Sequence, residues 1–270
     1  MNNTINNTIN NTINNKKISV AIPHYNNTMF INDTLLPLIN DDRIGEIIIR
    51  DDKSNDFNKL IEIVDLNNKI CNNKIKLFQN ITNIGCYHNK LLSINDCSYD
   101  WADLLKETPE KYTDSDNIYD KTCIDVIFNL PEWNTNIIYA PMWANTFPGN
   151  SSPNLNYSIY TNQNISKDIY LREFNNITFQ CLINTCNYFL PVKNYVNCMK
   201  KYNYERSIID SLDSAVLFSD WILNKNNIFV VNNLIYKHRL HPNSNYNISS
   251  SRKHEHNVKQ MLFNKIYNMS

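Results

Sequence analysis

Short runs of β-branched and other apolar residues alternate with stretches of helical spacing through the first 120 residues. Four of these runs are short enough to be buried strands, and a polar loop follows each one. Between the runs, apolar residues recur every three or four positions, which is typical of helices that cover a sheet. This alternation predicts an α/β fold, a mainly parallel sheet flanked by helices in a single domain. The predicted strands are residues 18–22, 46–50, 75–78 and 101–105.

Polar residues gather directly after these predicted strands. Because the carboxyl ends of parallel strands meet at one edge of an open sheet, we expect these residues to line a ligand site. Asp51 and Asp52 alone have a plainer interpretation, since acids at the start of a helix favour its dipole. The groups are His24 with Tyr25, Asp51 with Asp52, residues 83–90, and Asp114 with Asp116.

The triplet Asp114-Ser115-Asp116 is a candidate metal site. In an extended or turning backbone, side chains at i and i+2 point to the same side, so both carboxylates can reach one cation. Mg²⁺ or Mn²⁺ is commonly held by one or two carboxylates together with the oxygens of a substrate diphosphate. A solvated acidic loop is the alternative, because the chain is rich in Asp and Asn.

Composition narrows the function further. Lys plus Arg and Asp plus Glu both number 26, so charge indicates neither a nucleic-acid nor a membrane partner. The three glycines are too far apart for a glycine-rich phosphate loop. Seven scattered cysteines without a Cys-x-x-Cys pair argue against zinc. With no signal-peptide pattern and no membrane-spanning run, we expect reduced thiols and a cytoplasmic location.

Low-complexity and polar segments frame the expected domain. Residues 1–15 repeat Asn-Asn-Thr-Ile and predict a disordered leader. The domain is expected over 16–246, with a nucleotide-binding half (16–120) and an acceptor half (121–246), followed by a polar C-terminal tail (247–270). In the second half, a strand over 137–140 is expected to end at Pro141, and 142–164 is expected to be a long loop beside the active site. The heavy use of Asn, Ile, Lys and Tyr suggests an AT-rich genome, such as that of a low-GC bacterium, a protist or a large DNA virus, whose protein would work in the host cytoplasm.

Four motifs, in this order, resemble those of the family 2 glycosyltransferases of GT-A fold. The family pattern is an apolar strand ending in Pro-x-Tyr-Asn, then Glu-Ile-Ile-x-x-Asp-Asp-x-Ser, then Asn-x-Gly with a basic residue and Asn, then Asp-x-Asp. The resemblance is clear over 17–120 and looser to about 246. It departs from the family where 106–113 intervene before the Asp-x-Asp, and where His88 and Lys90 replace the usual arginine. The matching segments are Ile22-Pro23-His24-Tyr25-Asn26, Glu46-Ile47-Ile48-Ile49-Arg50-Asp51-Asp52-Lys53-Ser54, Asn83-Ile84-Gly85-Cys86-Tyr87-His88-Asn89-Lys90 and Asp114-Ser115-Asp116-Asn117.

The resemblance implies a site for a nucleotide-sugar. Tyr25 would lie against the base, a backbone group near Pro23 would touch it, and Asp51 or Asp52 would accept a hydrogen bond from a base N–H. Basic residues would approach the base or the diphosphate. The donor-binding set implied in this way consists of Pro23, His24, Tyr25, Asp51, Asp52, His88, Lys90, Asp114, Ser115, Arg239 and His241.

Residues of the second half would complete the site. The resemblance implies that Asp116, with Asp114, ligates Mn²⁺ or Mg²⁺. The segment Tyr236-Lys237-His238-Arg239-Leu240-His241 resembles a C-terminal element of the family, in which His238 would complete the metal shell. A structural histidine is the alternative.

An acid at the start of a helix is the general base in the family. Asp213 fits this place best and Asp210 second, because an apolar helical pattern begins here. An inverting transfer needs such a carboxylate to take the proton of the acceptor hydroxyl. For Asp210, simple helix capping is the alternative.

The expected function is transfer of a sugar from a nucleotide-sugar, a UDP-sugar by resemblance, to a hydroxyl of a glycan or other glycoconjugate, with inversion. One alternative is a catalytically inactive nucleotide-sugar or glycan-binding protein of the same fold. Another is a sugar-nucleotide pyrophosphorylase, but the glycine-rich opening of that class is missing.

Overall fold

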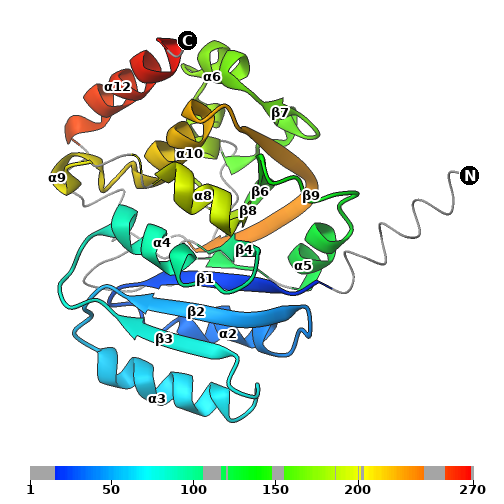
Figure 1. The fold of residues 1–270 in the computed structure, drawn as a ribbon, viewed down its shortest axis with the longest axis vertical. Helices are drawn as coiled ribbons and strands as arrows, with labels where there is room; N and C mark the ends of the chain where they lie inside the picture. Colours follow the sequence, from blue (N-terminus) through cyan, green and yellow to red (C-terminus); the bar gives the residue numbers. More distant parts are fainter. Residues whose placement is uncertain are drawn as a thin grey trace, which may run out of the picture.

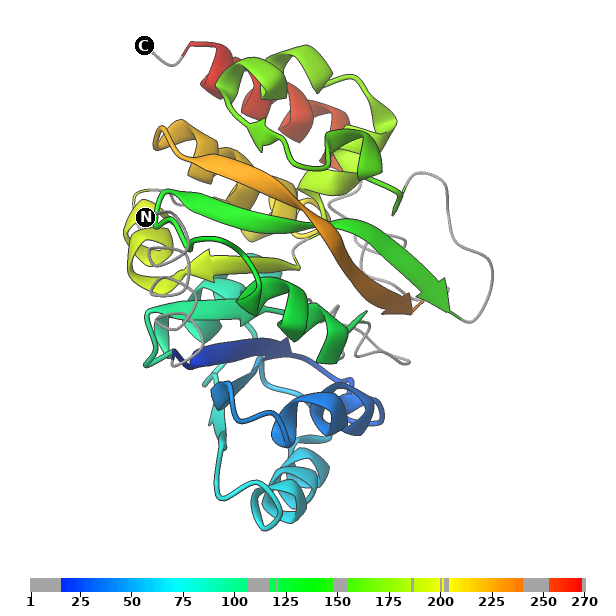
Figure 2. The ribbon, with the colours of Figure 1, turned by 90° about the vertical axis from the view of Figure 1, so that its right-hand side faces the viewer.

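The computed structural model describes residues 16–105, 117–119, 121–147, 155–185, 187–199, 201, 204–239 and 253–268. Within these residues the chain forms a nine-stranded sheet with helices on both faces (Figures 1 and 2). None of the helices described is long and apolar enough to cross a membrane. The strands are β1 (Ile18–His24), β2 (Ile44–Asp51), β3 (Ile75–Gln79), β4 (Trp101–Leu104), β5 (Asn117–Ile118), β6 (Ile137–Phe147), β7 (Asn164–Ile165), β8 (Tyr188–Pro191) and β9 (Asn227–Arg239).

Helices connect and cover these strands. Each of the first three strands is followed by a helix, as the alternating pattern predicts. The helices are α2 (Ile31–Ile39), α3 (Phe57–Asn68), α4 (Cys86–Asn95), α5 (Lys121–Phe128), α6 (Lys167–Glu173), α7 (Ile177–Ile183), α8 (Val192–Met199), α9 (Arg206–Ile209), α10 (Asp213–Leu223) and α12 (Glu255–Tyr267), with a 3₁₀ turn η2 (Ser158–Tyr160).

The strand order is β3-β2-β1-β4-β8-β6-β9-β5, with β7 paired to β9. Strands β1 to β4 are parallel to one another, β8 is antiparallel to both β4 and β6, and β6 and β9 are parallel. The chain leaves β1 on one side for β2 and returns on the other side for β4. This reversal makes a topological switch point between β1 and β4, where an open sheet binds its ligand at the carboxyl ends of the strands.

Both faces of the sheet are buried, which explains why its first strands read as continuous apolar runs. Along β1, Val20 and Ile22 pack with α2, α3 and α5, whereas Ala21 packs with α4, α8 and α10 on the other face. Burial against both layers fixes which side chains can reach the carboxyl edge. That edge is built by the loops that follow β1, β2 and β3.

Strand β6 corrects one expectation of the sequence analysis. The strand does not end at Pro141 but runs on to Phe147, so residues 142–147 are strand rather than loop. Proline has no N–H to donate, and the pairing with β9 shifts register directly after it. Between the pairs Pro141 with Val231 and Trp143 with Ile235, β9 advances by two more residues than β6, which is a β-bulge.

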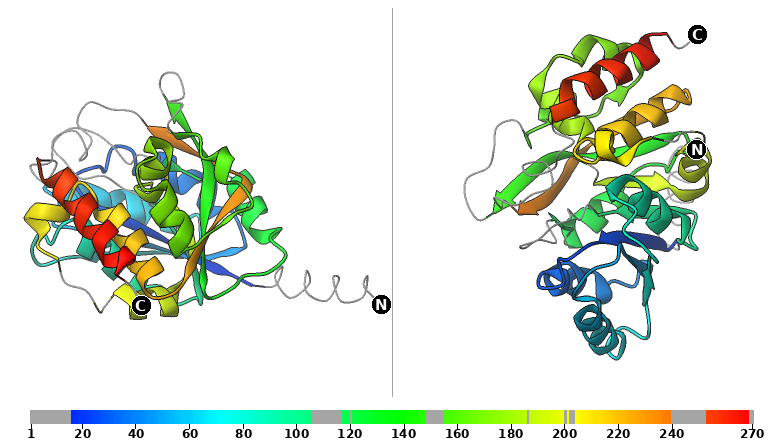
Figure 3. Two further views of the ribbon diagram at one scale, coloured as in Figure 1. Left: turned by 90° about the horizontal axis from the view of Figure 1, so that it is seen from above. Right: turned by 90° about the vertical axis from the view of Figure 1, so that its left-hand side faces the viewer.

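The segment expected to be a polar C-terminal tail contains the helix α12. Val258, Leu262 and Ile266 recur at every fourth position and are at most 1% exposed. They join the core cluster on the α10 face, and α12 packs against α6, α9 and α10 (Figure 3). The expected domain limit at 246 therefore leaves out a helix that belongs to this core.

Candidate functional site

His24 and Asp51 form a buried pair at the carboxyl ends of β1 and β2. His24 Nδ1 lies 2.9 Å from Asp51 Oδ1, and both side chains are fully buried. Asp51 also accepts hydrogen bonds from the backbone and hydroxyl of Ser54 and from Gln79 Nε2 at 3.0 Å. Burial alone would raise the pKa of Asp51, but these hydrogen bonds outweigh it and hold that pKa below its ordinary value. Both buried residues thus support the carboxyl edge of the sheet from beneath. Their contact with the nucleobase of a donor stays a prediction.

Asp52 fixes the loop that follows β3. Its Oδ1 accepts from Ile84 N at 2.8 Å and from Asn80 Nδ2 at 2.9 Å, and its Oδ2 accepts from Gly85 N at 2.8 Å. Gly85 has a φ of 88°, a backbone conformation that side-chain-bearing residues rarely adopt. Two motifs that are separate in the sequence, Asp-Asp and Asn-x-Gly, are therefore joined by direct hydrogen bonds.

Lys90 lies on α4 and forms a buried ion pair with Asp213 at the start of α10. The two side chains are 2% and 5% exposed, and Lys90 Nζ also donates to Ser214 Oγ at 3.0 Å. The structure therefore joins a predicted donor-binding residue to the predicted general base. His88, on the same helix, is half-buried and stands edge-on to Tyr87 with ring centroids 5.2 Å apart.

Arg206 was missed by the sequence analysis and connects two parts of the edge. Its Nε lies 2.8 Å from Asp210 Oδ2, and its Nη1 donates to Asn83 O at 3.1 Å. Burial raises the pKa of Asp210, although the hydrogen bond from Arg206 opposes this. Asp210 ends α9 rather than capping the start of α10. The only sequence signal for Arg206 was its spacing of four residues from Asp210.

Strand β5 pairs Asn117, the residue that follows the predicted metal-binding triplet in the sequence, with His238. Asn117 pairs with His238 across the antiparallel ladder of β5 and β9, and His238 Nδ1 lies 2.9 Å from Asn117 Oδ1. Asp116 is the residue bonded to Asn117 in the chain. Asp114, Ser115 and Asp116 themselves lie outside the described residues, as does His241.

Arg239 contacts Asp33 and Phe30 from the first half of the chain and Phe147 from the second. Its Nη2 lies 2.8 Å from Asp33 Oδ2, and its guanidinium stacks over the rings of Phe30 (4.3 Å) and Phe147 (4.7 Å). The guanidinium plane between two rings is a cation–π arrangement. Contact of Arg239 with a diphosphate stays a prediction. Tyr25, also predicted to bind donor, is half-buried in the loop after β1, and Pro23 is buried within that strand.

The ligand chemistry of the edge fits a divalent cation of the Mn²⁺ or Mg²⁺ kind. If Asp114 and Asp116 lie near His238, as the sequence analysis predicts, their carboxylates and its imidazole nitrogen would form a nitrogen and oxygen donor set that suits Mn²⁺. Among the residues that the structure describes, no three His, Cys, Asp or Glu groups gather as a metal centre.

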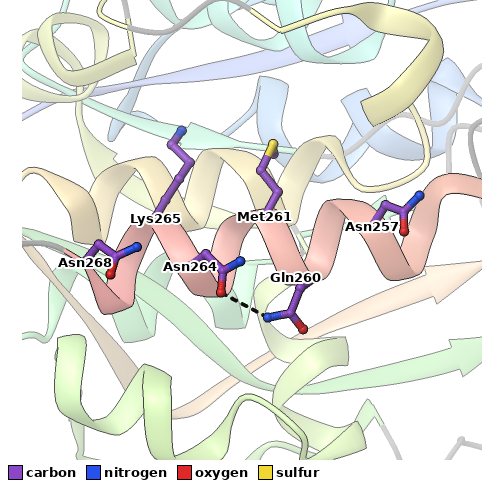
Figure 4. Close-up of a pocket in the computed structure, with 6 residues that line it drawn as sticks. All are labelled: Asn257, Gln260, Met261, Asn264, Lys265 and Asn268. Carbon is purple, nitrogen blue, oxygen red and sulfur yellow. Dashed lines mark hydrogen bonds between the residues drawn. The ribbon is translucent and has the colours of Figure 1, made fainter.

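A hollow on α12 lies away from these residues. It is lined by one helix and its C-terminal neighbour, and its polar groups are amides and one amine, with Gln260 donating to Asn264 at 3.0 Å (Figure 4). None of the predicted site residues lines it. Its lining residues are Asn257, Gln260, Met261, Asn264, Lys265 and Asn268.

Solved structures resemble this chain, whereas no protein-family model and no curated protein sequence matches it. Residues 1–349 of S. aureus TarS in complex with UDP give a TM-score of 0.65 at 17% identity, covering 94% of this chain and 66% of the TarS fragment. The same fragment with UDP-GlcNAc gives 0.68 at 16% identity, covering 94% and 67%. GalNAc-T7 with UDP, GalNAc and Mn²⁺ gives 0.55 at 12% identity, covering 83% and 43%.

These likenesses bear on the architecture. The chain spans about two thirds of the length of the TarS fragments, and the sequence identities are low throughout. What agrees is the overall fold, over 94% of this chain. The fold is the α/β fold of the GT-A glycosyltransferases, as the sequence motifs predict.

Proposed function

We propose that this protein is a glycosyltransferase that moves a sugar from a nucleotide-sugar, a UDP-sugar, to a hydroxyl of a glycan or other glycoconjugate. The pairing of Asn117 with His238 carries this proposal. It brings the residue after the Asp-x-Asp triplet into contact with a histidine 121 positions later, which supports a metal site that this histidine and the triplet would share. Structures of the same fold hold UDP, UDP-GlcNAc and Mn²⁺, which supports the donor class.

In this proposal the carboxyl edge binds the donor. The loop after β1 would place Tyr25, and the end of β2 would place the Asp51–Asp52 pair, beside the base, while Asp114, Asp116 and His238 would hold Mn²⁺ or Mg²⁺. Such a cation would supply positive charge that neutralises the charge developing on the leaving diphosphate. The chain's own residues orient the donor and take the proton of the acceptor.

Asp213 and Asp210 are the two candidates for the general base of an inverting transfer. Asp213 is held by Lys90 in a buried ion pair, and 5% of its side chain is exposed. Asp210 is more accessible, with 17% of its side chain exposed, and burial raises its pKa. Asp→Asn substitutions separate them, because the base variant loses transfer while its binding of UDP persists. An anomeric configuration that is retained in the product, read by NMR, contradicts inversion.

The first test is release of nucleoside diphosphate from a panel of nucleotide-sugars. We expect release with Mn²⁺, none with EDTA, and loss in Asp116→Ala. Asp42→Ala is the matched control, since Asp42 is an exposed acid ahead of β2, at the other end of that strand. Binding of UDP without turnover of any donor, with or without acceptor, favours the inactive binding protein. Absence of UDP binding in calorimetry with Mn²⁺ refutes the proposal.

A further inference from the structure

A chain of side-chain amides stands behind His238. Asn117 Oδ1 faces His238 Nδ1 at 2.9 Å, and Asn117 Nδ2 donates to Asn187 Oδ1 at 3.2 Å. Asn187 Nδ2 in turn donates to the backbone oxygen of Thr185 at 2.9 Å. The chain thus links β5, β9 and the segment before β8, which are far apart in the sequence.

The Thr185 end of this row of amides decides which group donates and which accepts in each of its hydrogen bonds. A backbone carbonyl can only accept, so the Thr185 oxygen requires the NH₂ group of Asn187. Asn187 then presents its oxygen to Asn117, which must answer with its own NH₂ group. Asn117 is left with its oxygen toward His238, and an oxygen acceptor requires a proton on Nδ1.

Burial prevents the two amide groups from being reversed. Asn117 is 1% exposed and Asn187 is fully buried, so water cannot substitute for a reversed amide. A reversed Asn187 would set two oxygens against each other at the Thr185 carbonyl, which is costly in a dry interior. The neighbouring Tyr119 hydroxyl also donates to the backbone oxygen of Asn187 at 3.4 Å, which helps to hold this segment.

We propose that Asn117 and Asn187 are positioning residues that orient the His238 ring and keep a proton on its Nδ1. Nε2 then bears the lone pair that a metal ion needs, and the ring is oriented before the metal arrives. The tautomer follows from the hydrogen bonds alone, whereas its use for metal binding rests on the proposed function. Partners of this kind, which hold a ligating histidine from behind, commonly change metal affinity by 10- to 100-fold when they are removed.

Nitrogen-15 NMR of the full chain, labelled on histidine, tests the tautomer directly. At a pH where the imidazole is neutral, we expect the His238 signals, assigned by their loss in His238→Gln, to report a proton on Nδ1 and none on Nε2. A proton on Nε2 in the wild type overturns the proposal. This measurement needs neither activity nor any variant of the amide chain.

A matched pair of substitutions separates hydrogen bonding from packing. Asn117→Asp loses the donor to Asn187 but keeps an acceptor opposite Nδ1, so it should keep the proton on Nδ1. Asn117→Leu has nearly the same shape without an acceptor and should lose that preference. Mn²⁺ binding in the presence of UDP, followed by electron paramagnetic resonance, should weaken by about tenfold or more in Asn117→Leu. Unchanged tautomer and unchanged Mn²⁺ affinity in that variant overturn the proposal. The expected tautomer in a wild type that binds no Mn²⁺ supports the amide chain and refutes the metal-dependent function instead.

Discussion

Replacing Lys90 by methionine should destabilise the fold more than any other single loss of charge at the carboxyl edge. Lys90 and Asp213 are 2% and 5% exposed, so neither can be solvated when the other is removed. Methionine keeps the length and apolar character of the lysine stem and removes only the ammonium. The substitution therefore leaves the Asp213 carboxylate buried without its cation.

The size of the effect follows from these contacts. Removing one member of a buried ion pair typically costs about 3–5 kcal/mol of unfolding free energy. The lost hydrogen bond from Lys90 to Ser214 Oγ, 3.0 Å long, adds about 1 kcal/mol. We therefore expect a loss of about 4 kcal/mol or more, a large part of the ~5–15 kcal/mol stability of an ordinary domain.

Urea unfolding followed by circular dichroism measures this loss. Lys259→Met is the control, because Lys259 pairs with Glu255 four residues away on α12, with both side chains more than a fifth exposed, and such pairs are worth about 0.5 kcal/mol. Adding Asp213→Leu to Lys90→Met should restore most of the loss, since an apolar pair replaces a buried ionic one at little cost. A Lys90→Met loss no larger than that of Lys259→Met, or a double variant less stable than the single one, refutes the reasoning.

Three further changes test other parts of the structure. Burial raises the pKa of Asp220 from its ordinary 3.8 to about 6, so the folded protein binds this proton more tightly than the unfolded chain does. The protein should therefore lose stability on the order of 3 kcal/mol as pH rises from about 4 through 6, and Asp220→Asn should remove this loss in a pH series of unfolding midpoints. An unchanged pH dependence in Asp220→Asn counts against this prediction. Gly85→Ala should cost more than ~1 kcal/mol in urea unfolding, because φ is 88° and the new Cβ would lie 2.6 Å from Arg206 Nε; a neutral result would mean that this loop rearranges freely. Because the buried Leu262 anchors α12 in the domain core, Leu262→Ala should lower the free energy of unfolding by about 2–5 kcal/mol. Tyr267→Ala, at an exposed position of the same helix, is the control and should change it very little. Equal effects of the two substitutions would mean that α12 does not belong to the core.

The sheet of the first half could be predicted because its signals are local. Strands buried on both faces read as continuous apolar runs, and each is followed within a few residues by a helical pattern. The motif residues Asp51, Asp52 and Gly85 then fall at the carboxyl edge by topology alone.

The second half was harder because its signals are weak or broken. Pro141 predicts the end of a strand, yet a β-bulge accommodates this proline within β6. In α12 the fully buried residues form a narrow stripe, Val258, Leu262 and Ile266, beside the partly buried Met261 and Phe263. The remaining residues are mostly polar, so the sequence suggested a polar tail. The stripe is regular, and its spacing of four could have indicated the helix.

The contacts between distant residues of the site could not be predicted from the sequence. Lys90 and Asp213 are 123 positions apart, and nothing in either motif shows that they pair. The link from Arg206 to Asn83 spans the same separation. Such contacts depend on how α4, α9 and α10 pack over the sheet, which no local pattern encodes.

The bulge between β6 and β9 gives the molecule a place where chain length can change without harm to the site. Asn232 and Asn233 are exposed at the point where β9 has its two additional residues, and Asn233 already adopts a positive φ. The pairing before the bulge anchors β9 to the core, and the pairing after it carries His238 to its place opposite Asn117. Insertions or deletions at this joint are therefore absorbed between two separately registered segments. Homologues that differ in length here can keep the same histidine in the same position, and a flexible tag inserted at this joint should leave the edge of the sheet intact.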